Sequence, residues 1–312
     1  MPEVRDSPDS QTVLVKQAVD MFVAATPPVG APISEWRQGF ERLCSSFDIP
    51  RDARVEKIDE DGVHGMVITA KGASSDRLVM HLHSGGYVMG SSTAYRNFAC
   101  RLSEATSATV FLADYRLAPE HPYPAAVDDA VAAFRWCSRR HDASRTIISG
   151  DSAGGGLAIA TLLALRDAKA ELPAAGIAIS PLLDLSGEGD SMRTNAATDP
   201  LIDRTMVVEM GKVYIGDIDP HQHPLASPLW GEHHGLPPLF LTASASEVLR
   251  DDAVRLAESV RRAGGRVTVS LPDGMVHIWT LFPFLPEAAN SLALIGKFAR
   301  ECWSAGGTYA ER

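Results

Sequence analysis

A serine between two glycines is the residue in this sequence best suited to nucleophilic chemistry. Ser152 lies in Gly-Asp-Ser-Ala-Gly, between an apolar, strand-like run at 146–149 and a helical pattern at 152–169. A turn tight enough to lift a serine hydroxyl out of a sheet leaves no room for side chains two residues away, which accounts for Gly150 and Gly154. The helix that follows directs its N-terminal N–H groups and its dipole toward a developing oxyanion. The pattern predicts a serine nucleophile.

A glycine-rich phosphate loop is the competing interpretation of this segment. A Walker loop would place lysine after Gly155, but Gly156 stands there. A dinucleotide loop beginning at Gly154 would need glycine or alanine where the chain has Ile159. Neither pattern is met. For Asp151, just before the serine, two interpretations stay open: a part in catalysis, or a helix-start carboxylate favoured by the dipole.

A glycine pair upstream could bind the oxyanion that forms when the serine attacks an acyl group. Gly85 and Gly86 follow the strand-like run 78–82, and their unshielded backbone N–H groups are the donors that an acyl oxyanion needs. A metal site is the alternative, because His81 and His83 share one face of a strand. A binuclear H-x-H-x-D-H site would continue with Asp and His, where the glycines stand. We therefore expect an oxyanion loop and no metal.

The elements that must position these loops alternate between strand-like and helical patterns from residue 77 to about 300. This alternation is typical of a mostly parallel sheet with helices on both faces. A hairpin signal at Asp61-Gly62 precedes it, between runs at 55–58 and 63–69. Strands are expected at 78–82, 109–113, 146–149, 175–179, 239–242 and 267–271, and helices at 94–104, 125–139, 152–169, 251–263 and 287–302.

Two segments fall outside this alternation. Residues 1–50 contain two amphipathic helical patterns joined by a Pro/Gly turn, and residues 185–234 form a polar, Gly/Pro-rich insertion with a helical stretch near 203–214. Insertions at the C-terminal ends of parallel strands lie where ligands bind. We expect the two segments to form a cap over a catalytic domain of residues 51–312.

Composition excludes some classes of partner and indicates the cellular compartment. The 312 residues carry a net charge of −10 without a basic cluster, which argues against nucleic acid or an anionic membrane and favours a small neutral ligand. The sequence has no N-terminal signal pattern and no run of about 18 apolar residues, so no membrane insertion is expected. Scattered cysteines are typical of reduced thiols in a cytoplasmic protein: Cys44, Cys100, Cys137 and Cys302.

Over about residues 50–300 the chain resembles the hormone-sensitive-lipase family of α/β-hydrolases, the bacterial carboxylesterases. His83-Ser84-Gly85-Gly86 is similar to the family's HGGG loop, residues 150–155 match its GDSAGG elbow, and residues 114–120 match the DYRLAPE stretch between them. The resemblance implies an α/β-hydrolase fold with a mostly parallel sheet of about eight strands flanked by helices, a helical cap, the chain order Ser, acid, His, and no cofactor. It also implies a homodimer, since family members often pair through a terminal strand and helix.

The resemblance assigns the rest of the catalytic machinery. Glu247 stands where the family usually has Asp, and some members use Glu at this position. His277 follows the last expected strand and is the expected base, which takes the Ser152 proton while Glu247 orients its ring. The expected oxyanion donors are the N–H groups of Gly85, Gly86 and Ala153.

Two nearby carboxylates, Asp251 and Asp252, compete with Glu247 for the acid position. They begin the following helix and are expected to be its first-turn carboxylates. The separation of 30 residues between Glu247 and His277 also resembles the family's spacing.

The chain departs from the family pattern in the oxyanion loop and in the acyl pocket. Ser84 replaces the first glycine of the loop, which would cost on the order of 1 kcal/mol if that position needs a positive φ. Leu182 stands where the family often has tryptophan, so either the acyl pocket is roomier or neighbouring side chains fill the gap. Tyr87, Leu182 and Ile278 are the expected substrate-binding residues.

The expected function is a carboxylesterase that hydrolyses short to medium acyl esters through an acyl-enzyme, with a small-molecule ester as its partner. An amidase or lactonase with the same triad is the alternative among enzymes. A non-catalytic small-molecule-binding protein is the alternative of another class; the plant gibberellin receptor resembles this family but lacks the His, which is present here as His277.

Overall fold

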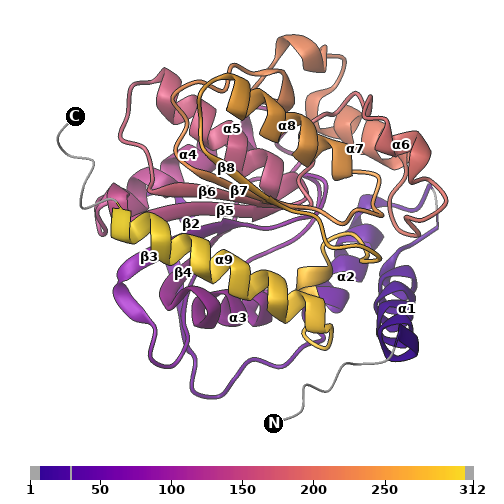
Figure 1. Ribbon diagram of the computed structural model, residues 1–312, viewed down its shortest axis with the longest axis horizontal. Coiled ribbons are helices and arrows are strands. Elements are labelled where there is room, and N and C mark those ends of the chain that lie inside the picture. The colour runs from indigo at the N-terminus through magenta and orange to yellow at the C-terminus, as the bar shows by residue number, and fades with distance from the viewer. Residues whose placement is uncertain (1–7, 29, 306–312) are drawn as a thin grey trace.

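The computed structural model describes residues 8–28 and 30–305, and its centre is one eight-stranded sheet (Figure 1). The strand order is β1-β2-β4-β3-β5-β6-β7-β8. β2 runs antiparallel to both its neighbours, β1 and β4, and the remaining pairs are parallel. The strands are β1 (Arg54–Glu60), β2 (Val63–Thr69), β3 (Ser74–Leu82), β4 (Ala108–Ala113), β5 (Thr146–Asp151), β6 (Ala175–Ile179), β7 (Leu239–Thr242) and β8 (Val267–Ser270). The expected hairpin and the expected mostly parallel sheet are both present.

Helices cover both faces of this sheet, which explains the continuous apolar runs in its central strands. Every residue of β4, β5, β6 and β7 is buried, whereas the edge strand β1 is mostly exposed. Helices α3 and α9 lie together on one face, and α4, α5 and α8 lie on the other (Figure 1). Their bounds are α3 (Arg96–Thr106), α9 (Pro286–Ala305), α4 (Ala125–Ser138), α5 (Ala153–Asp167) and α8 (Arg250–Arg262).

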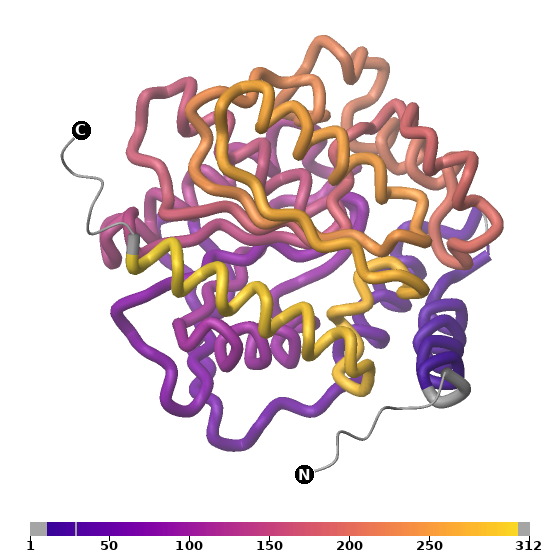
Figure 2. Tube along the Cα trace, in the orientation of Figure 1, coloured from indigo at the N-terminus to yellow at the C-terminus, as the bar shows by residue number. Residues whose placement is uncertain are grey.

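The remaining helices come from two segments far apart in the sequence. The N-terminal segment forms α1 (Pro8–Ala25) and α2 (Ile33–Cys44), and the insertion between β6 and β7 contains α6 (Ser191–Thr194) and α7 (Arg204–Ile215). Figure 2 shows both segments on the same side of the molecule. The described residues also contain four short 3₁₀ turns: η1 (Ala143–Arg145), η2 (Pro220–Gln222), η3 (Pro228–Trp230) and η4 (Trp279–Leu281).

A set of hydrogen bonds from Arg37, here called the polar clasp, joins α2 to the segments that follow β3 and β4. The Arg37 guanidinium pairs with the Glu120 carboxylate through two hydrogen bonds of 2.8 and 2.6 Å. The same side chain donates to the carbonyl oxygens of Val88, at 2.8 Å, and Ala118, at 2.9 Å. Because Val88 belongs to the loop after β3, this clasp ties the N-terminal helices to the backbone beside the expected oxyanion donors.

All four cysteines are buried and unpaired. Among the described residues, no helix is both long enough and apolar enough to span a bilayer.

Candidate active site

Ser152 occupies a strained turn between β5 and α5. Its φ of 52° and ψ of −121° lie where non-glycine residues are rare, a strain of about 1–3 kcal/mol that tight packing must offset. A Cβ at Gly150 would lie 2.0 Å from the Gly154 carbonyl oxygen, and a Cβ at Gly154 would lie 2.0 Å from the carbonyl oxygen of Leu82. The two glycines therefore permit the turn, as the sequence pattern indicated.

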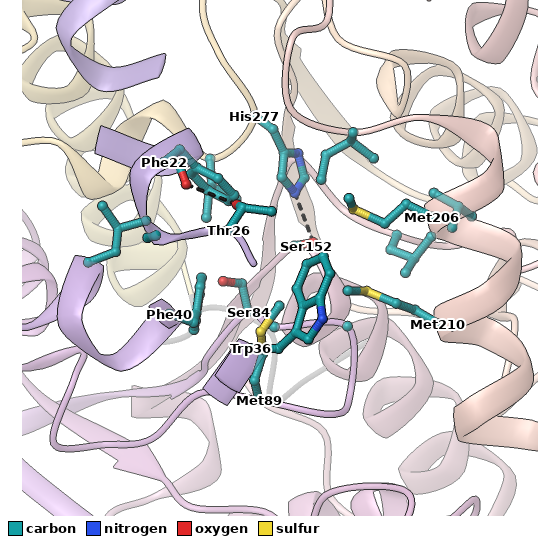
Figure 3. A pocket seen from close by; sticks show the side chains of 18 of the residues that line it. Phe22, Thr26, Trp36, Phe40, Ser84, Met89, Ser152, Met206, Met210 and His277 are labelled. Atoms are coloured by element: carbon teal, nitrogen blue, oxygen red, sulfur yellow. Dashed lines mark hydrogen bonds between the residues drawn. The ribbon is translucent and has the colours of Figure 1, made fainter. Parts of the chain in front are cut away.

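The structure brings Ser152, His277 and Glu247 into one hydrogen-bonded row. The His277 Nε2 atom lies 2.9 Å from Ser152 Oγ, and its Nδ1 atom lies 2.6 Å from Glu247 Oε2 (Figure 3 shows the serine and histidine). The three residues follow β5, β7 and β8, parallel strands whose carboxyl ends lie at the same edge of the sheet.

The Glu247 carboxylate is held on its other oxygen as well. Ser180 Oγ and the Ser244 backbone N–H donate to Oε1, at 2.8 and 2.7 Å. Ser180 Oγ in turn accepts a hydrogen bond of 3.2 Å from the backbone N–H of Ile278, the residue after the histidine. These contacts fix the acid relative to the imidazole, which fixes the tautomer with its free nitrogen toward Ser152.

Burial and charge act in opposite directions on the histidine. Burial by itself lowers the pKa of His277, but the hydrogen bond and negative charge of Glu247 outweigh it, so the net shift is upward from 6.5. An imidazole with this shift accepts a proton more readily and holds it more firmly than a free histidine does.

The competing carboxylates lie away from the histidine. Asp251 accepts a 2.8 Å hydrogen bond from the Ser191 N–H and pairs with Arg250. Asp252 accepts the backbone N–H groups of residues 183 and 184, at 2.7 and 2.9 Å. Complete burial, with the nearby charge of Asp184 second, raises the pKa of Asp252 to about 8. Both residues lie in the first turn of α8, where the sequence indicated them.

The loop after β3 has the conformation that its glycines require. Gly85 and Gly86 have φ angles of 121° and 60°. A Cβ at Gly85 would lie 2.2 Å from the Met89 carbonyl oxygen. Ser84 does not adopt a positive φ, so the strain considered for its replacement of glycine does not arise. On the facing side, the first helical bond of α5 runs from the Gly156 N–H to the Ser152 carbonyl, which leaves the Ala153 N–H without an acceptor in the helix.

His81, in β3, and His83, just after it, are both engaged with protein groups. The ring nitrogens of His81 lie 3.1 Å from Ser149 Oγ and 3.2 Å from Asp151 Oδ1. His83 stacks on Tyr115 with ring centroids 4.3 Å apart, and its Nδ1 lies 2.8 Å from the Ser84 carbonyl. The Asp151 carboxylate is buried, and its hydrogen bonds go to the side chains of His81 and Tyr95.

An apolar cavity opens in front of Ser152 (Figure 3), with a volume of about 60 Å³. Three groups of residues line it: Phe22, Trp36 and Phe40 from the N-terminal helices, Gly85, Gly86 and Met89 from the loop after β3, and Ile202, Met206 and Met210 from the insertion. Leu182 and Ile278, both expected to contact substrate, are among the lining residues.

The structure puts Tyr87 elsewhere than the substrate pocket. It is not among the residues that line the cavity, and its ring stacks on Tyr214 of α7 with centroids 3.9 Å apart. The expected substrate-binding role of Tyr87 therefore has no support from its position. Sequence reasoning missed Trp36, Met206 and Met210, since it assigned their segments to the cap without identifying the side chains that face the serine.

Comparison with known proteins places these features in a family. Residues 79–281 match a family model described as the alpha/beta hydrolase fold. An esterase from the bacterial hormone-sensitive lipase family superimposes with a TM-score of 0.90 at 37% identity, covering 96% of this chain and 100% of the other. The chain belongs to the hormone-sensitive-lipase family of α/β-hydrolases. That membership confirms the expected fold and agrees with the expected hydrolase class.

Similar proteins carry the names acetyl-hydrolase and esterase. An acetyl-hydrolase of Streptomyces hygroscopicus is 42% identical over 232 residues, 74% of this chain and 77% of its own length. An esterase of Acinetobacter venetianus is 34% identical over 265 residues, 84% of this chain and 87% of its own. A structure of EstE5, soaked by p-nitrophenyl butyrate, superimposes with a TM-score of 0.89 at 37% identity, covering 96% of this chain and all of EstE5.

Proposed function

We propose that this hormone-sensitive-lipase family member is a carboxylesterase that cleaves short to medium acyl esters through an acyl-enzyme. The observation that carries the proposal is the row of hydrogen bonds from Ser152 through His277 to Glu247, with the serine facing an apolar cavity. The names of the relatives, acetyl-hydrolase and esterase, support the same class of substrate.

In the first half of the reaction, Ser152 Oγ attacks the ester carbonyl carbon while His277 Nε2 takes the hydroxyl proton. The carbonyl π electrons move to oxygen, which becomes the oxyanion of a tetrahedral intermediate. The C–O bond to the alcohol then breaks, and the imidazolium returns its proton to the departing alcohol. Glu247 stabilises the imidazolium between these steps.

The oxyanion is held by the backbone N–H groups of Gly85 and Gly86 on one side and Ala153 on the other. Donors fixed in advance of the reaction stabilise the intermediate without reorganising, and each such donor contributes about 10²–10³ in kcat. In the second half of the reaction, water replaces the alcohol and the same groups repeat the cycle, which releases the acid.

The lining of the cavity limits the substrate. Among the described lining residues, His277 is the only titratable side chain, so a charged acyl or alcohol group would lose its hydration without gaining a partner. The volume of about 60 Å³ favours the short end of the acyl range. A neutral ester with a small acyl group fits these constraints best.

The test combines labelling with a substrate panel. An organophosphate is expected to label Ser152, and Ser152→Ala is expected to lose activity on p-nitrophenyl esters, whereas Ser138→Ala on the distant helix α4 keeps it. Rates on matched p-nitrophenyl esters, anilides and lactones identify the preferred bond. A preference for anilides or lactones would favour an amidase or lactonase instead, and tight binding without turnover would favour a non-catalytic binding protein.

A further inference from the structure

A second buried row of hydrogen bonds lies behind the oxyanion loop. The Tyr95 hydroxyl, at the start of α3, donates to Asp151 Oδ2 at 2.7 Å. It also hydrogen-bonds Ser84 Oγ, and the Ser84 backbone N–H donates to it at 3.3 Å. All three residues are at most 1% exposed. The row runs from the loop after β3, through α3, to the last residue of β5.

The directions of these bonds follow from counting protons. Tyr95 has one hydroxyl proton, and the Asp151 carboxylate accepts it. The bond between Tyr95 and Ser84 must then use the serine proton, so the tyrosine oxygen accepts both from the Ser84 hydroxyl and from its N–H. Burial, together with the nearby charge of Asp151, raises the pKa of Tyr95 well above its usual range, so the phenol keeps its proton.

The row connects the two halves of the proposed oxyanion hole. Ser84 directly precedes Gly85, whose N–H is a donor on the loop. Asp151 directly precedes Ser152, the nucleophile, which is followed by Ala153, the donor at the start of α5. These donors belong to separate segments, and catalytic geometry must be held to within about 0.5 Å.

We propose that Ser84, Tyr95 and Asp151 are positioning residues that hold the oxyanion loop at a fixed distance from the nucleophile. The inference rests on the proposed esterase function. It assigns a task to the Ser84 hydroxyl, which the family's usual glycine cannot perform: it gives the loop a second attachment to Tyr95 beside the backbone N–H.

The expected fall in kcat depends on how many of these hydrogen bonds each substitution removes. Tyr95→Phe removes the acceptor of both Ser84 donors and one donor to Asp151, whereas Ser84→Ala removes the hydroxyl bond and keeps the N–H. Displacing a donor by about 1 Å costs up to about 10²-fold in rate. We therefore expect kcat to fall about 10–100-fold in Tyr95→Phe and about 3–10-fold in Ser84→Ala, with KM within about threefold of wild type.

The matched control is Tyr214→Phe. Tyr214 is a buried tyrosine whose hydroxyl has no hydrogen-bond partner among the described residues, so its variant removes the same atom without breaking a bond. Each enzyme is first titrated with an organophosphate, and kcat is expressed per reactive serine, which removes any difference in the folded fraction. Tyr214→Phe is expected to keep kcat within about twofold of wild type.

Two further readouts separate positioning from a loss of stability. Affinity for a trifluoromethyl ketone, which forms a tetrahedral adduct on the serine, is expected to fall by the same factor as kcat/KM. The double variant Ser84→Ala/Tyr95→Phe is expected to be no slower than Tyr95→Phe alone, because the serine donors already lack their acceptor.

Unchanged kcat and ketone affinity per titrated site in Tyr95→Phe, or a loss confined to KM, would overturn the proposal. If Tyr95→Phe fails to fold, Ser84→Ala decides the matter by the same two readouts. A wild-type enzyme that the organophosphate does not label at Ser152 would instead refute the esterase function, so the two failures are distinguishable.

Discussion

The substitution Gly154→Ala tests how closely the nucleophile elbow approaches the oxyanion loop. The added Cβ would lie 2.0 Å from the Leu82 carbonyl oxygen and 2.4 Å from that of His83. Both atoms are backbone, so no side chain can rotate to make room. An ordinary carbon–oxygen contact is about 3.3 Å, so the helix start and the loop must separate by about 1.3 Å.

This separation acts directly on the geometry of the reaction. Misplacing reacting groups by about 1 Å costs about 10²-fold in rate, which corresponds to about 2.7 kcal/mol in the barrier. We expect kcat/KM for p-nitrophenyl acetate to fall about 100-fold in Gly154→Ala, measured per serine titrated with an organophosphate and accompanied by a thermal unfolding curve.

Gly155→Ala is the matched comparison one residue along the same helix. Its Cβ would lie 3.0 Å from the Cβ of Pro181 and 3.1 Å from its Cα, so the neighbour needs to give by only a few tenths of an ångström. We expect kcat/KM within about fivefold of wild type. Equal activities of the two variants, or a Gly154→Ala enzyme within threefold of wild type, would refute the close-approach argument.

Three other substitutions address the acid, a buried carboxylate and the pocket. Glu247→Gln should lower kcat by about 10⁴ and move the acid limb of kcat/KM from above pH 6.5 to lower pH. The limb reports His277, which cannot accept the serine proton while it is itself protonated, and the variant lacks the charge that raises the pKa of this histidine. Asp251→Asn should change neither quantity, and the reverse pattern would mean that Asp251 is the acid. Asp252 binds a proton in the folded state up to a pKa of about 8, so wild-type stability should fall relative to Asp252→Asn as pH rises from about 4 to 8; parallel urea-unfolding curves across this range would contradict that. Leu182→Trp should shift the acyl-length optimum of kcat/KM toward shorter chains, and an unmoved optimum would mean that Leu182 does not shape the acyl site.

Local patterns explain what the sequence could predict. The elbow around Ser152 depends on a strand, two glycines and a helix that are contiguous in the sequence, from Thr146 to Asp167, and each leaves a signal in composition. The sheet was predictable because strands buried on both faces are continuously apolar. The acid could not be identified from local sequence alone, because three carboxylates lie within six residues and look alike until their hydrogen bonds are known. Glu247 was identified from a resemblance in spacing.

Features that depend on long-range packing left no such signal. Tyr95 joins Ser84 to Asp151 across three elements, and nothing in the sequence near Tyr95 distinguishes it from a core tyrosine. Tyr87 was expected in the pocket, but its ring stacks on Tyr214 of α7, a contact between distant segments that no local pattern indicates. The methionines of α7 could be assigned to the insertion but not to a face of it.

Part of the cavity wall comes from segments that do not carry the hydrogen bonds from Ser152 to Glu247. Trp36 and Met210 belong to segments outside the sheet, whereas the row from Ser152 to Glu247 belongs to loops that the strands hold. Substitutions at Trp36 and Met210 can therefore alter which ester is accepted while the hydrogen bonds from Ser152 to Glu247 are preserved. Libraries restricted to the lining residues of α1, α2 and α7 are therefore where changes of substrate preference should be sought.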